Sequence, residues 1–420
     1  MAIYQATTSA PVNIACIKYW GKRDTTLILP TNSSLSVTLS QDHLRSTTTS
    51  QADPSFTETR LWLNGKEEDI KSGGRLERCL KELKKMRKER IEDKDHNAPK
   101  LSEWNIHVAS YNNFPTAAGL ASSASGFAAL TSSIAALYDL NNFSPSSSAK
   151  PSAASPSELS LVARLGSGSA CRSLFGGFVA WEAGSLPSGN DSLAVQVAPQ
   201  EHWPTLHALI CVVNDAKKGT SSTSGMQRTV ETSALLQHRI KEVVPQRMDA
   251  IIKAIKEKDF DTFAKITTAD SNQFHAVALD TAPPIFYMND VSRSIISIIE
   301  ELNRVSLLNT GHLVAAYTFD AGPNAVIYTE EKNVKQIIEL VLRYFPQAES
   351  NPFPDPFQLF GGKQPAGTTT LPEGFNEGVA KVWETGSVKG LIHTKIGDGP
   401  RVLAEGEALL SSDGMPKTLA

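Results

Sequence analysis

The sequence predicts a two-lobed fold of mixed strands and helices, α/β or α+β in class. Short apolar runs typical of strands alternate with longer runs at helical spacing along most of the chain. The 420 residues are enough for two cores, or for one large unit with a cleft. The chain shows no internal repeat, and we expect the lobes to divide near residue 200.

The first part of the chain predicts strands followed by a helix. Three β-like runs cover residues 12–20, 34–40 and 60–65, and the last ends on the hairpin-favouring pair Asn64-Gly65. A helix is predicted from Arg75 onward, because apolar residues recur there at helical spacing: Leu76, Cys79, Leu80, Leu83 and Met86. The rest of this helix mixes both signs of charge, which favours a solvated face over a nucleic-acid patch.

The middle of the chain predicts a strand at 104–112 and a helix at 121–140. Residues 142–157 are rich in Ser, Pro and Ala, have almost nothing to bury, and are predicted to form a surface insert. A short helix, a glycine-serine turn and a strand are expected to follow, up to residue 182.

The second half predicts both element types again. A polar loop is expected at 216–227, and two or three amphipathic helices are expected between Thr229 and Leu279. The other predicted helices cover 291–305 and 334–345, and the predicted strands cover 208–215, 312–319, 325–329 and 391–397.

Bulk properties exclude several classes of protein. The net charge of −3 provides no global positive field for nucleic acid or for a membrane surface. No apolar run approaches the roughly 18 residues of a membrane span, and the N-terminus lacks the pattern of a signal peptide. The four cysteines are far apart, which is typical of reduced thiols, and the histidines show no zinc-binding spacing. We therefore expect a cytoplasmic protein without a metal cage of its own.

The segment Asn113–Gly126, NFPTAAGLASSASG, is the first candidate site. Small residues let a backbone approach phosphate oxygens, and the first N–H groups of the helix that follows lack intrahelical partners. The helix dipole and the serine hydroxyls favour an anion at the same place. Tight packing of a small-residue helix against a sheet explains the composition equally well.

Two further segments could supply cations. Lys18 and Lys22 flank a predicted turn at Gly21, although both lysines could simply face water. The segment 166–177, GSGSACRSLFGG, lacks the last glycine of a dinucleotide fingerprint, so a Rossmann site is not supported. Its backbone, its hydroxyls and Arg172 suit a carboxylate or a diphosphate, and a plain tight turn fits equally well.

Two other segments complete the candidate set. Residues 217–226, KKGTSSTSGM, could contact an anion or form a plain polar loop. Asp320 follows a predicted strand in YTFDAGPNA, where it could act as a general base or serve only to form the turn.

Taken in order, these segments resemble the mevalonate diphosphate decarboxylase family of the GHMP kinase superfamily. The loop PTAAGLASSASG is similar to the superfamily's phosphate-binding motif. The family resemblance includes NIACIKYWGKRD, LPTNSSLSVTLS, GSGSACRSLFGG, DSNQFHA, PPIFYMND and YTFDAGPNA. It extends over nearly the whole chain and is weakest at 142–157 and after Tyr344.

The resemblance implies an α+β fold with a deep cleft between two lobes. Residues 1–200 would form the N-terminal GHMP-kinase-like ATP-binding lobe, like domain 2 of ribosomal protein S5, and would carry the insert at 142–157. Residues 201–420 would form a ferredoxin-like C-terminal lobe. The implied protein is a cytoplasmic homodimer of the mevalonate pathway, which feeds isoprenoid and sterol synthesis.

The implied reaction converts (R)-5-diphosphomevalonate and ATP into isopentenyl diphosphate, CO2, ADP and phosphate. Mg²⁺ would be held through the ATP phosphates, without a protein metal site. A kinase that stops after phosphorylating the 3-hydroxyl, and a non-catalytic metabolite sensor, are the alternatives. A sensor would be expected to have lost Lys18, Arg172 or Asp320, and all three are present.

The resemblance also assigns roles to residues. Asp320, Lys18 and Arg172 would be catalytic, and Arg172 would contact the substrate carboxylate. The residues implied in substrate binding are Tyr19, Trp20, Gly21, Lys22, Arg75, Ser167, Gly168, Ser169, Ala170, Cys171, Arg172 and Thr223. Those implied in ATP binding are Pro115, Ala118, Gly119, Leu120, Ala121, Ser122, Ser123, Ser125 and Ser222.

Overall fold

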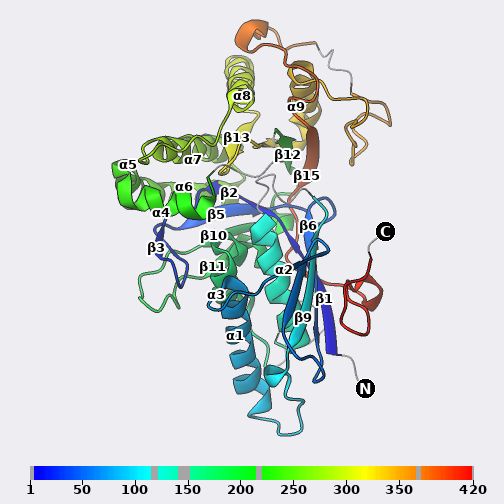
Figure 1. Cartoon of the computed structure of the whole chain (residues 1–420). Coiled ribbons are helices and arrows are strands. Elements are labelled where there is room, and N and C mark those ends of the chain that lie inside the picture. The colour runs from blue at the N-terminus through cyan, green and yellow to red at the C-terminus, as the bar shows by residue number, and fades with distance from the viewer. Residues whose placement is uncertain (1–3, 115–121, 141–151, 214–219, 366–369, 419–420) are drawn as a thin grey trace.

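The strands build three main sheets, each covered by helices (Figure 1). The computed structural model describes residues 4–114, 122–140, 152–213, 220–365 and 370–418. Within these residues every pair of neighbouring strands is antiparallel except β7 with β9. Because antiparallel pairing dominates, the fold is α+β and not the parallel α/β alternative. The predicted two-lobed α+β fold is confirmed.

The first sheet is six-stranded, in the order β16-β1-β6-β9-β7-β8. Helix α2 (Ser122–Leu137) packs on β1 and β6, and β16 brings the C-terminal part of the chain to the edge beside β1. The strands are β1 (Tyr4–Pro11), β6 (Arg45–Ala52), β7 (Arg60–Leu63), β8 (Lys66–Glu68), β9 (Ile106–Asn112) and β16 (Arg401–Val402).

The contact between α2 and this sheet is unusually polar. Strand β6 reads RSTTTSQA, yet most of it is buried. Its Ser46 and Ser50 hydroxyls lie 2.7 Å from those of Ser125 and Ser133 on α2. Paired hydroxyls satisfy one another, so a polar strand can be buried here.

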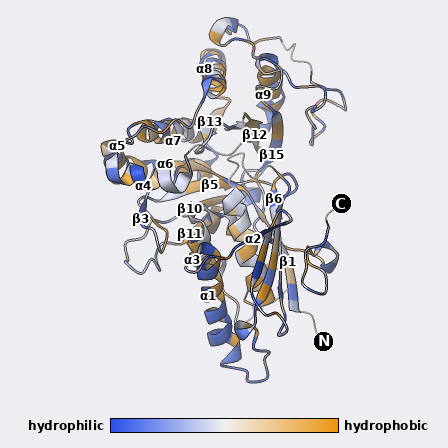
Figure 2. Ribbon diagram, viewed as in Figure 1, coloured by the Kyte–Doolittle hydropathy of each residue, from blue (hydrophilic) through white to orange (hydrophobic). Residues whose placement is uncertain are grey.

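Two local predictions in this lobe are confirmed. Asn64 and Gly65 both have positive φ, as a two-residue hairpin between β7 and β8 requires. Helix α1 (Arg75–Arg87) buries the predicted apolar stripe except Met86, which is half-buried. Its lower part is mostly blue in Figure 2, as expected of a solvated face. Helix α3 (Pro156–Gly166) packs beside α1 and begins at Ser155 with a capping box formed with Glu158.

The other two main sheets are four-stranded. One has the order β11-β10-β5-β2 and the other β13-β14-β12-β15, and a short β3-β4 pair lies apart. The strands are β2 (Asn13–Ile17), β3 (Lys22–Asp24), β4 (Leu29–Pro30), β5 (Ser34–Thr38), β10 (Phe178–Trp181), β11 (Ala194–Ala198), β12 (Leu206–Val212), β13 (Ala316–Phe319), β14 (Ala325–Glu330) and β15 (Gly390–Lys395).

Strand β12 shows how the cores are arranged. Its alternate residues Leu206, Ala208 and Ile210 join a core that also holds residues of β2 and β5. Leu209 and Cys211 face a second core, with the helices at the top of Figure 1. Alternation of side chains across a strand gives the sheet two buried faces, and one face connects it to the sheet that contains β2.

The second half of the chain supplies most of the helices. They are α4 (Ser222–Thr232), α5 (Ala234–His238), α6 (Val244–Glu257), α7 (Phe260–Leu279), α8 (Asp290–Thr310) and α9 (Glu331–Tyr344). Shorter helical segments are η1 (Lys88–Glu92), η2 (Leu101–Glu103), η3 (Gly168–Leu174), η4 (Gln200–His202), η5 (Arg239–Val243), η6 (Glu377–Val379) and η7 (Glu405–Glu407). In the described part of the chain no helix has the length and apolar character of a membrane span.

The predicted loop at 216–227 is wrong for its second half. Helix α4 begins at Ser222, seven residues before the first helix was expected. The Ser221 side chain accepts the Ser224 N–H and caps the helix, while Met226 is buried. Serine-rich composition is typical of a loop, but the same residues can cap a helix. Residues 216–219 lie outside the described residues.

A cluster of histidines lies on the third sheet. His207 Nδ1 and His393 Nε2 are 2.8 Å apart, and Phe357 packs against both rings and against His43. Burial, with the charges of His207 and His43, lowers the pKa of His393 to about 3. Burial also lowers the pKa of His207. The folded protein therefore favours the neutral form of these rings.

These histidines predict a loss of stability in acid. A histidine whose pKa is lowered by folding gives stability that is complete above its ordinary value of 6.5, and that is lost as the pH falls below it toward 3. We expect the free energy of unfolding, measured by urea titration at pH 7 and pH 5, to decrease in acid. A His393→Gln variant should show a shallower decrease, because its side chain does not titrate. Equal slopes for the two proteins would contradict this prediction.

Candidate active site

Lys18 and Asp320 form an ion pair across two sheets. Lys18 directly follows β2, and Asp320 directly follows β13. The Lys18 Nζ atom donates to Asp320 Oδ1 over 2.7 Å; the lysine side chain is 3% exposed and the aspartate side chain 31%. The two sheets are in direct contact, since the Tyr328 hydroxyl of β14 donates to the Ile14 carbonyl of β2 at 3.2 Å. The pair is thus a buried ammonium beside a carboxylate that remains open to a reactant.

Arg172 is a buried cation with neutral partners. It lies in η3, is 2% exposed, and donates to Ser34 Oγ at 2.5 Å, Ser36 Oγ at 2.9 Å and Asn13 Oδ1 at 3.3 Å. Burial lowers its pKa, which the nearby carboxylate of Asp320 partly offsets. All of these partners are neutral, so none balances the guanidinium charge. An anionic ligand bound beside Arg172 would balance it.

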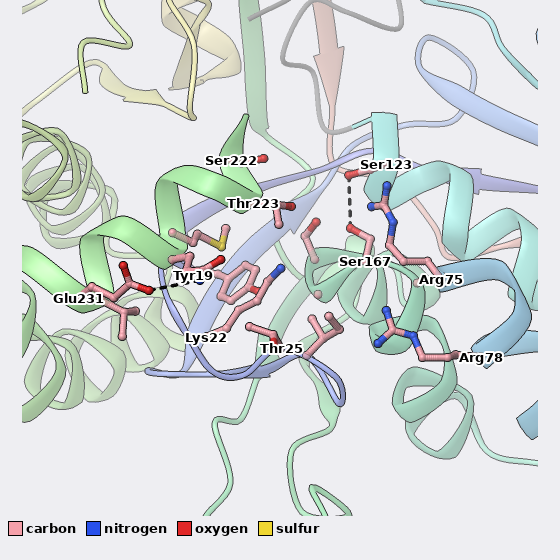
Figure 3. A pocket seen from close by; sticks show the side chains of 17 residues that line it. Tyr19, Lys22, Thr25, Arg75, Arg78, Ser123, Ser167, Ser222, Thr223 and Glu231 are labelled. Carbon is pink, nitrogen blue, oxygen red and sulfur yellow. Dashed lines mark hydrogen bonds between the residues drawn. The ribbon is translucent and has the colours of Figure 1, made fainter. Parts of the chain in front are cut away.

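A cavity of about 650 Å³ is lined by chain neighbours of these residues, Tyr19 and Ser169 among them (Figure 3). Lys18, Arg172 and Asp320 themselves do not line it. Its lining comes from the turn after β2, from α1, from the start of α2, from η3 and from α4. The predicted site residues that line it are Tyr19, Lys22, Arg75, Ser123, Ser167, Gly168, Ser169, Ser222 and Thr223. The structure thus brings together four segments that the sequence singled out separately.

The cavity carries a cluster of positive charge. Lys22, Arg75 and Arg78 line it, and Figure 3 shows all three side chains around the same space. Burial, followed by the charges of Arg75 and Arg78, lowers the pKa of Lys22. Glu231 also lines the cavity, so three cations face one carboxylate there. A ligand with two or more negative charges would offset the repulsion among the cations.

Helix N-termini add donors to the same cavity. Ser222 and Thr223 open α4, and Ser123 lies in the first turn of α2, where its hydroxyl is 3.2 Å from that of Ser167. Both helices present their positive ends and their hydroxyls to the cavity lining.

Other predicted site residues do not line the cavity. Trp20, Ala170 and Cys171 are buried in the protein, and Gly21 has a left-handed φ of 96° that positions the turn before Lys22. The Trp20 indole donates to Thr229 Oγ1 at 3.0 Å. Their roles in substrate binding stay predictions.

Most residues of the predicted ATP-binding loop lie outside the part of the chain that the structure describes. Pro115, Ala118, Gly119, Leu120 and Ala121 are outside the described residues, as are Lys217 and Lys218. Ser122 begins α2 as described, and the Ser125 hydroxyl lies against Ser46 of β6.

Several residues of the site were missed in the sequence. Ser34 and Ser36 alternate along β5 and therefore share one face, which is the signal that could have paired them with a buried cation. Arg78 lies three residues after Arg75 on α1, so both fall on the same side of the helix. No sequence pattern indicated that Asn13 belongs to the site, since its partners Arg172 and Ser173 are distant in sequence.

The cysteines do not provide a nucleophile. All four are buried and unpaired, and burial raises the pKa of the Cys171 thiol to about 12. A thiol with so high a pKa stays protonated at neutral pH and is a poor nucleophile.

Comparison with known proteins agrees with this geometry. A family described as "Diphosphomevalonate decarboxylase-like N-terminal domain" matches residues 10–194, and "Mevalonate 5-diphosphate decarboxylase C-terminal domain" matches residues 208–403. A diphosphomevalonate decarboxylase of Ganoderma lucidum is 67% identical over 99% of this chain and 100% of its own length. The rat enzyme of the same name is 48% identical over 98% of this chain and 96% of its own.

Solved structures of mevalonate diphosphate decarboxylases are also similar to this chain. A mevalonate diphosphate decarboxylase from Trypanosoma brucei is 34% identical, with a TM-score of 0.82, over 97% of this chain and 100% of the other. A structure described as MDDEF in complex with MVAPP, AMPPCP and magnesium is 29% identical, with a TM-score of 0.69, over 96% of this chain and 99% of the other. The chain therefore belongs to the diphosphomevalonate decarboxylase family.

Proposed function

We propose that this chain catalyses the ATP-dependent decarboxylation of (R)-5-diphosphomevalonate to isopentenyl diphosphate in the mevalonate pathway. The observation that carries the proposal is the Lys18–Asp320 pair, together with a buried Arg172 whose hydrogen-bond partners are neutral. The cationic cavity lined by neighbouring residues supports it. The relatives named above carry the same activity in their names.

The first chemical step is phosphoryl transfer to the tertiary 3-hydroxyl. Asp320 would orient this hydroxyl and take its proton as the oxygen attacks the γ-phosphorus and the bond to ADP breaks. Lys18 would orient the carboxylate and lie near the transferred phosphoryl group. Mg²⁺ bound through the ATP phosphates would supply further charge neutralisation, and the hydroxyl-lined ends of α2 and α4 suit such a phosphate-bound ion.

The second step is the loss of two groups. The C3–O bond breaks and releases phosphate, which leaves positive character at C3. The C1–C2 bond then breaks to give CO2, and its electron pair forms the C2=C3 double bond. Arg172 would hold the carboxylate in place, and the Asp320 carboxylate would stabilise the positive charge at C3.

The cavity would hold the diphosphate end of the substrate. Lys22 and Arg75 would bind it, with Ser167, Gly168, Ser169 and Thr223 as additional donors. ATP would bind at the start of α2 and along α4, through Ser122, Ser123 and Ser222 together with the segment 115–121.

We also propose an organisation for the chain as a whole. Residues 1–200 would form the ATP-binding lobe and residues 201–420 the second lobe, in a homodimer. The four unpaired cysteines fit a reducing compartment and support a cytoplasmic location.

The test measures all products in one reaction. Purified protein with ATP, Mg²⁺ and (R)-5-diphosphomevalonate should release CO2, isopentenyl diphosphate, ADP and phosphate in equal amounts. Formation of ADP with a stable 3-phosphorylated product would refute decarboxylation and identify a kinase.

The diphosphate assignment predicts a selective loss of substrate affinity. Arg75→Ala should raise KM for diphosphomevalonate about 10- to 100-fold, because a charge-assisted hydrogen bond is worth about 1.5–3 kcal/mol. KM for ATP should change little. Lys81→Ala is the matched control, since Lys81 is an exposed cation on the same helix, away from the cavity. Equal KM values for the two variants would remove Arg75 from the substrate site.

A further inference from the structure

One turn of helix α7 contacts the backbone on both sides of the catalytic pair. The segment Asp270–His275 belongs to the motif DSNQFHA, and the proposed reaction gives it no role. Asp270 Oδ2 accepts the Lys18 N–H at 2.7 Å. The next residue, Ser271, accepts through its Oγ the N–H of Phe319 at 2.9 Å, and Phe319 directly precedes Asp320. Two adjacent helical residues thus hold the chain at Lys18 and at Asp320.

The Lys18 side of this arrangement is held by buried charge. Asp270 and Arg239 are both fully buried and form a two-pronged ion pair at 2.8 and 2.9 Å. Arg239 also donates to the Lys18 carbonyl at 3.1 Å. Asp270 and Arg239 together therefore bind both the N–H and the carbonyl of Lys18. Burial alone would raise the pKa of Asp270, but Arg239 and the other donors hold it below its usual range. Arg247 adds a contact to Asp270 at 2.9 Å.

The Asp320 side is held by neutral groups. Ser271 is 1% exposed, and its bond to Phe319 fixes the last residue of β13. His275 lies one turn further along α7, is 4% exposed and also contacts the Phe319 backbone. Burial, followed by the charge of Lys18, lowers the pKa of His275 to about 4, so this ring adds no charge beside the pair at neutral pH.

We propose that α7 acts as a template that sets the geometry of the Lys18–Asp320 pair, with Asp270 and Ser271 as positioning residues. The proposal rests on the proposed function, which makes that pair catalytic. Lys18 and Asp320 come from different sheets and need a common rigid reference. Adjacent residues on one helix supply it, and misplacing reacting groups by about 1 Å can cost about 10²-fold in rate.

The first test compares two alanine variants on this helix. Ser271→Ala removes the bond to Phe319, and we expect kcat to fall about tenfold, with KM for both substrates within about twofold of wild type. Asn272→Ala is the matched control, because it removes a bond of similar length, 3.0 Å to the Tyr317 hydroxyl, between the same helix and the same strand. The control should keep kcat within about twofold of wild type, and both variants should melt at similar temperatures.

The second test addresses Asp270 without leaving Arg239 unpaired. Removing the carboxylate alone would strand a buried guanidinium and unfold the chain for an unrelated reason. Two double variants avoid this: Asp270→Asn with Arg239→Met, and Asp270→Leu with Arg239→Met. Both remove the charges of Asp270 and Arg239 and leave Arg247 with Gln273 Oε1 as its acceptor at 3.0 Å. Only Asn keeps an acceptor for the Lys18 N–H. We expect the Asn form to keep a kcat about tenfold above that of the Leu form, measured at a temperature where thermal melts show both to be folded. The Leu form should melt at a lower temperature, because the buried Lys18 N–H loses its acceptor.

The outcomes separate this inference from the proposed function. A wild-type protein that releases no CO2 would refute the proposed function itself. If wild type is active and Asp320→Asn is inactive, equal kcat values for Ser271→Ala and Asn272→Ala would overturn the role of Ser271. Equal kcat values for the two double variants would overturn that of Asp270.

Discussion

Replacing Asp320 by asparagine should abolish phosphoryl transfer, lowering kcat by about 10²- to 10⁴-fold, the range typical of a lost general base. Asparagine keeps the shape of the side chain and can still accept the hydrogen bond that Lys18 Nζ donates at 2.7 Å. It cannot take the proton of the 3-hydroxyl, and it carries no negative charge to stabilise positive character at C3. Both chemical steps are therefore impaired by one atom change.

The measurement follows ADP and CO2 separately. Both should fall together, because the departing phosphate must first be transferred. Calorimetric titration with diphosphomevalonate, and a thermal melt, should show that binding and folding are retained. Near-normal turnover with intact binding would remove Asp320 from the mechanism.

Much of the fold was predictable because its local signals are strong. The apolar spacing on α1 and the Asn64-Gly65 turn both predicted the observed elements, since helical periodicity and positive φ are properties of short segments. Strand β6 carried no such signal. It is polar and is buried only because serines of α2 pair with its hydroxyls, which is a tertiary property.

The candidate site also divides into residues that the sequence indicates and residues whose role depends on tertiary contacts. Lys18, Arg172 and Asp320 were found through motifs that resemble a family, and the structure places Lys18 against Asp320. The residues that orient them lie in motifs that the resemblance includes, such as DSNQFHA, but the sequence assigned them no role. Ser271 and Asp270 accept hydrogen bonds from backbone N–H groups. Almost every residue type carries such a group, so the residue type of the partner gives no sign of the bond. Sequence patterns thus identified the reactive groups more readily than the framework that holds them.

Replacing Arg172 by lysine should reduce kcat/KM for diphosphomevalonate about 10²-fold or more. The estimate follows because each charge-assisted hydrogen bond is worth about 1.5–3 kcal/mol, and about 1.4 kcal/mol is tenfold. A lysine keeps one positive charge but lacks the planar fork that contacts Ser34, Ser36 and Asn13 together. The ammonium of a buried lysine also loses its proton more readily. The substrate carboxylate would therefore lose both a correctly oriented donor and a positively charged partner.

The matched control is Arg87→Lys, because Arg87 is equally buried at 2% exposure but pairs with Glu92, away from the site. Both variants should lose thermal stability, since both disrupt hydrogen bonds of a buried guanidinium. Only Arg172→Lys should lose affinity for diphosphomevalonate, with KM for ATP unchanged. If both variants bind diphosphomevalonate as wild type does, Arg172 does not hold the carboxylate. The Asp320 carboxylate, which partly offsets the lowered pKa of Arg172, would then be the group on which its charge acts.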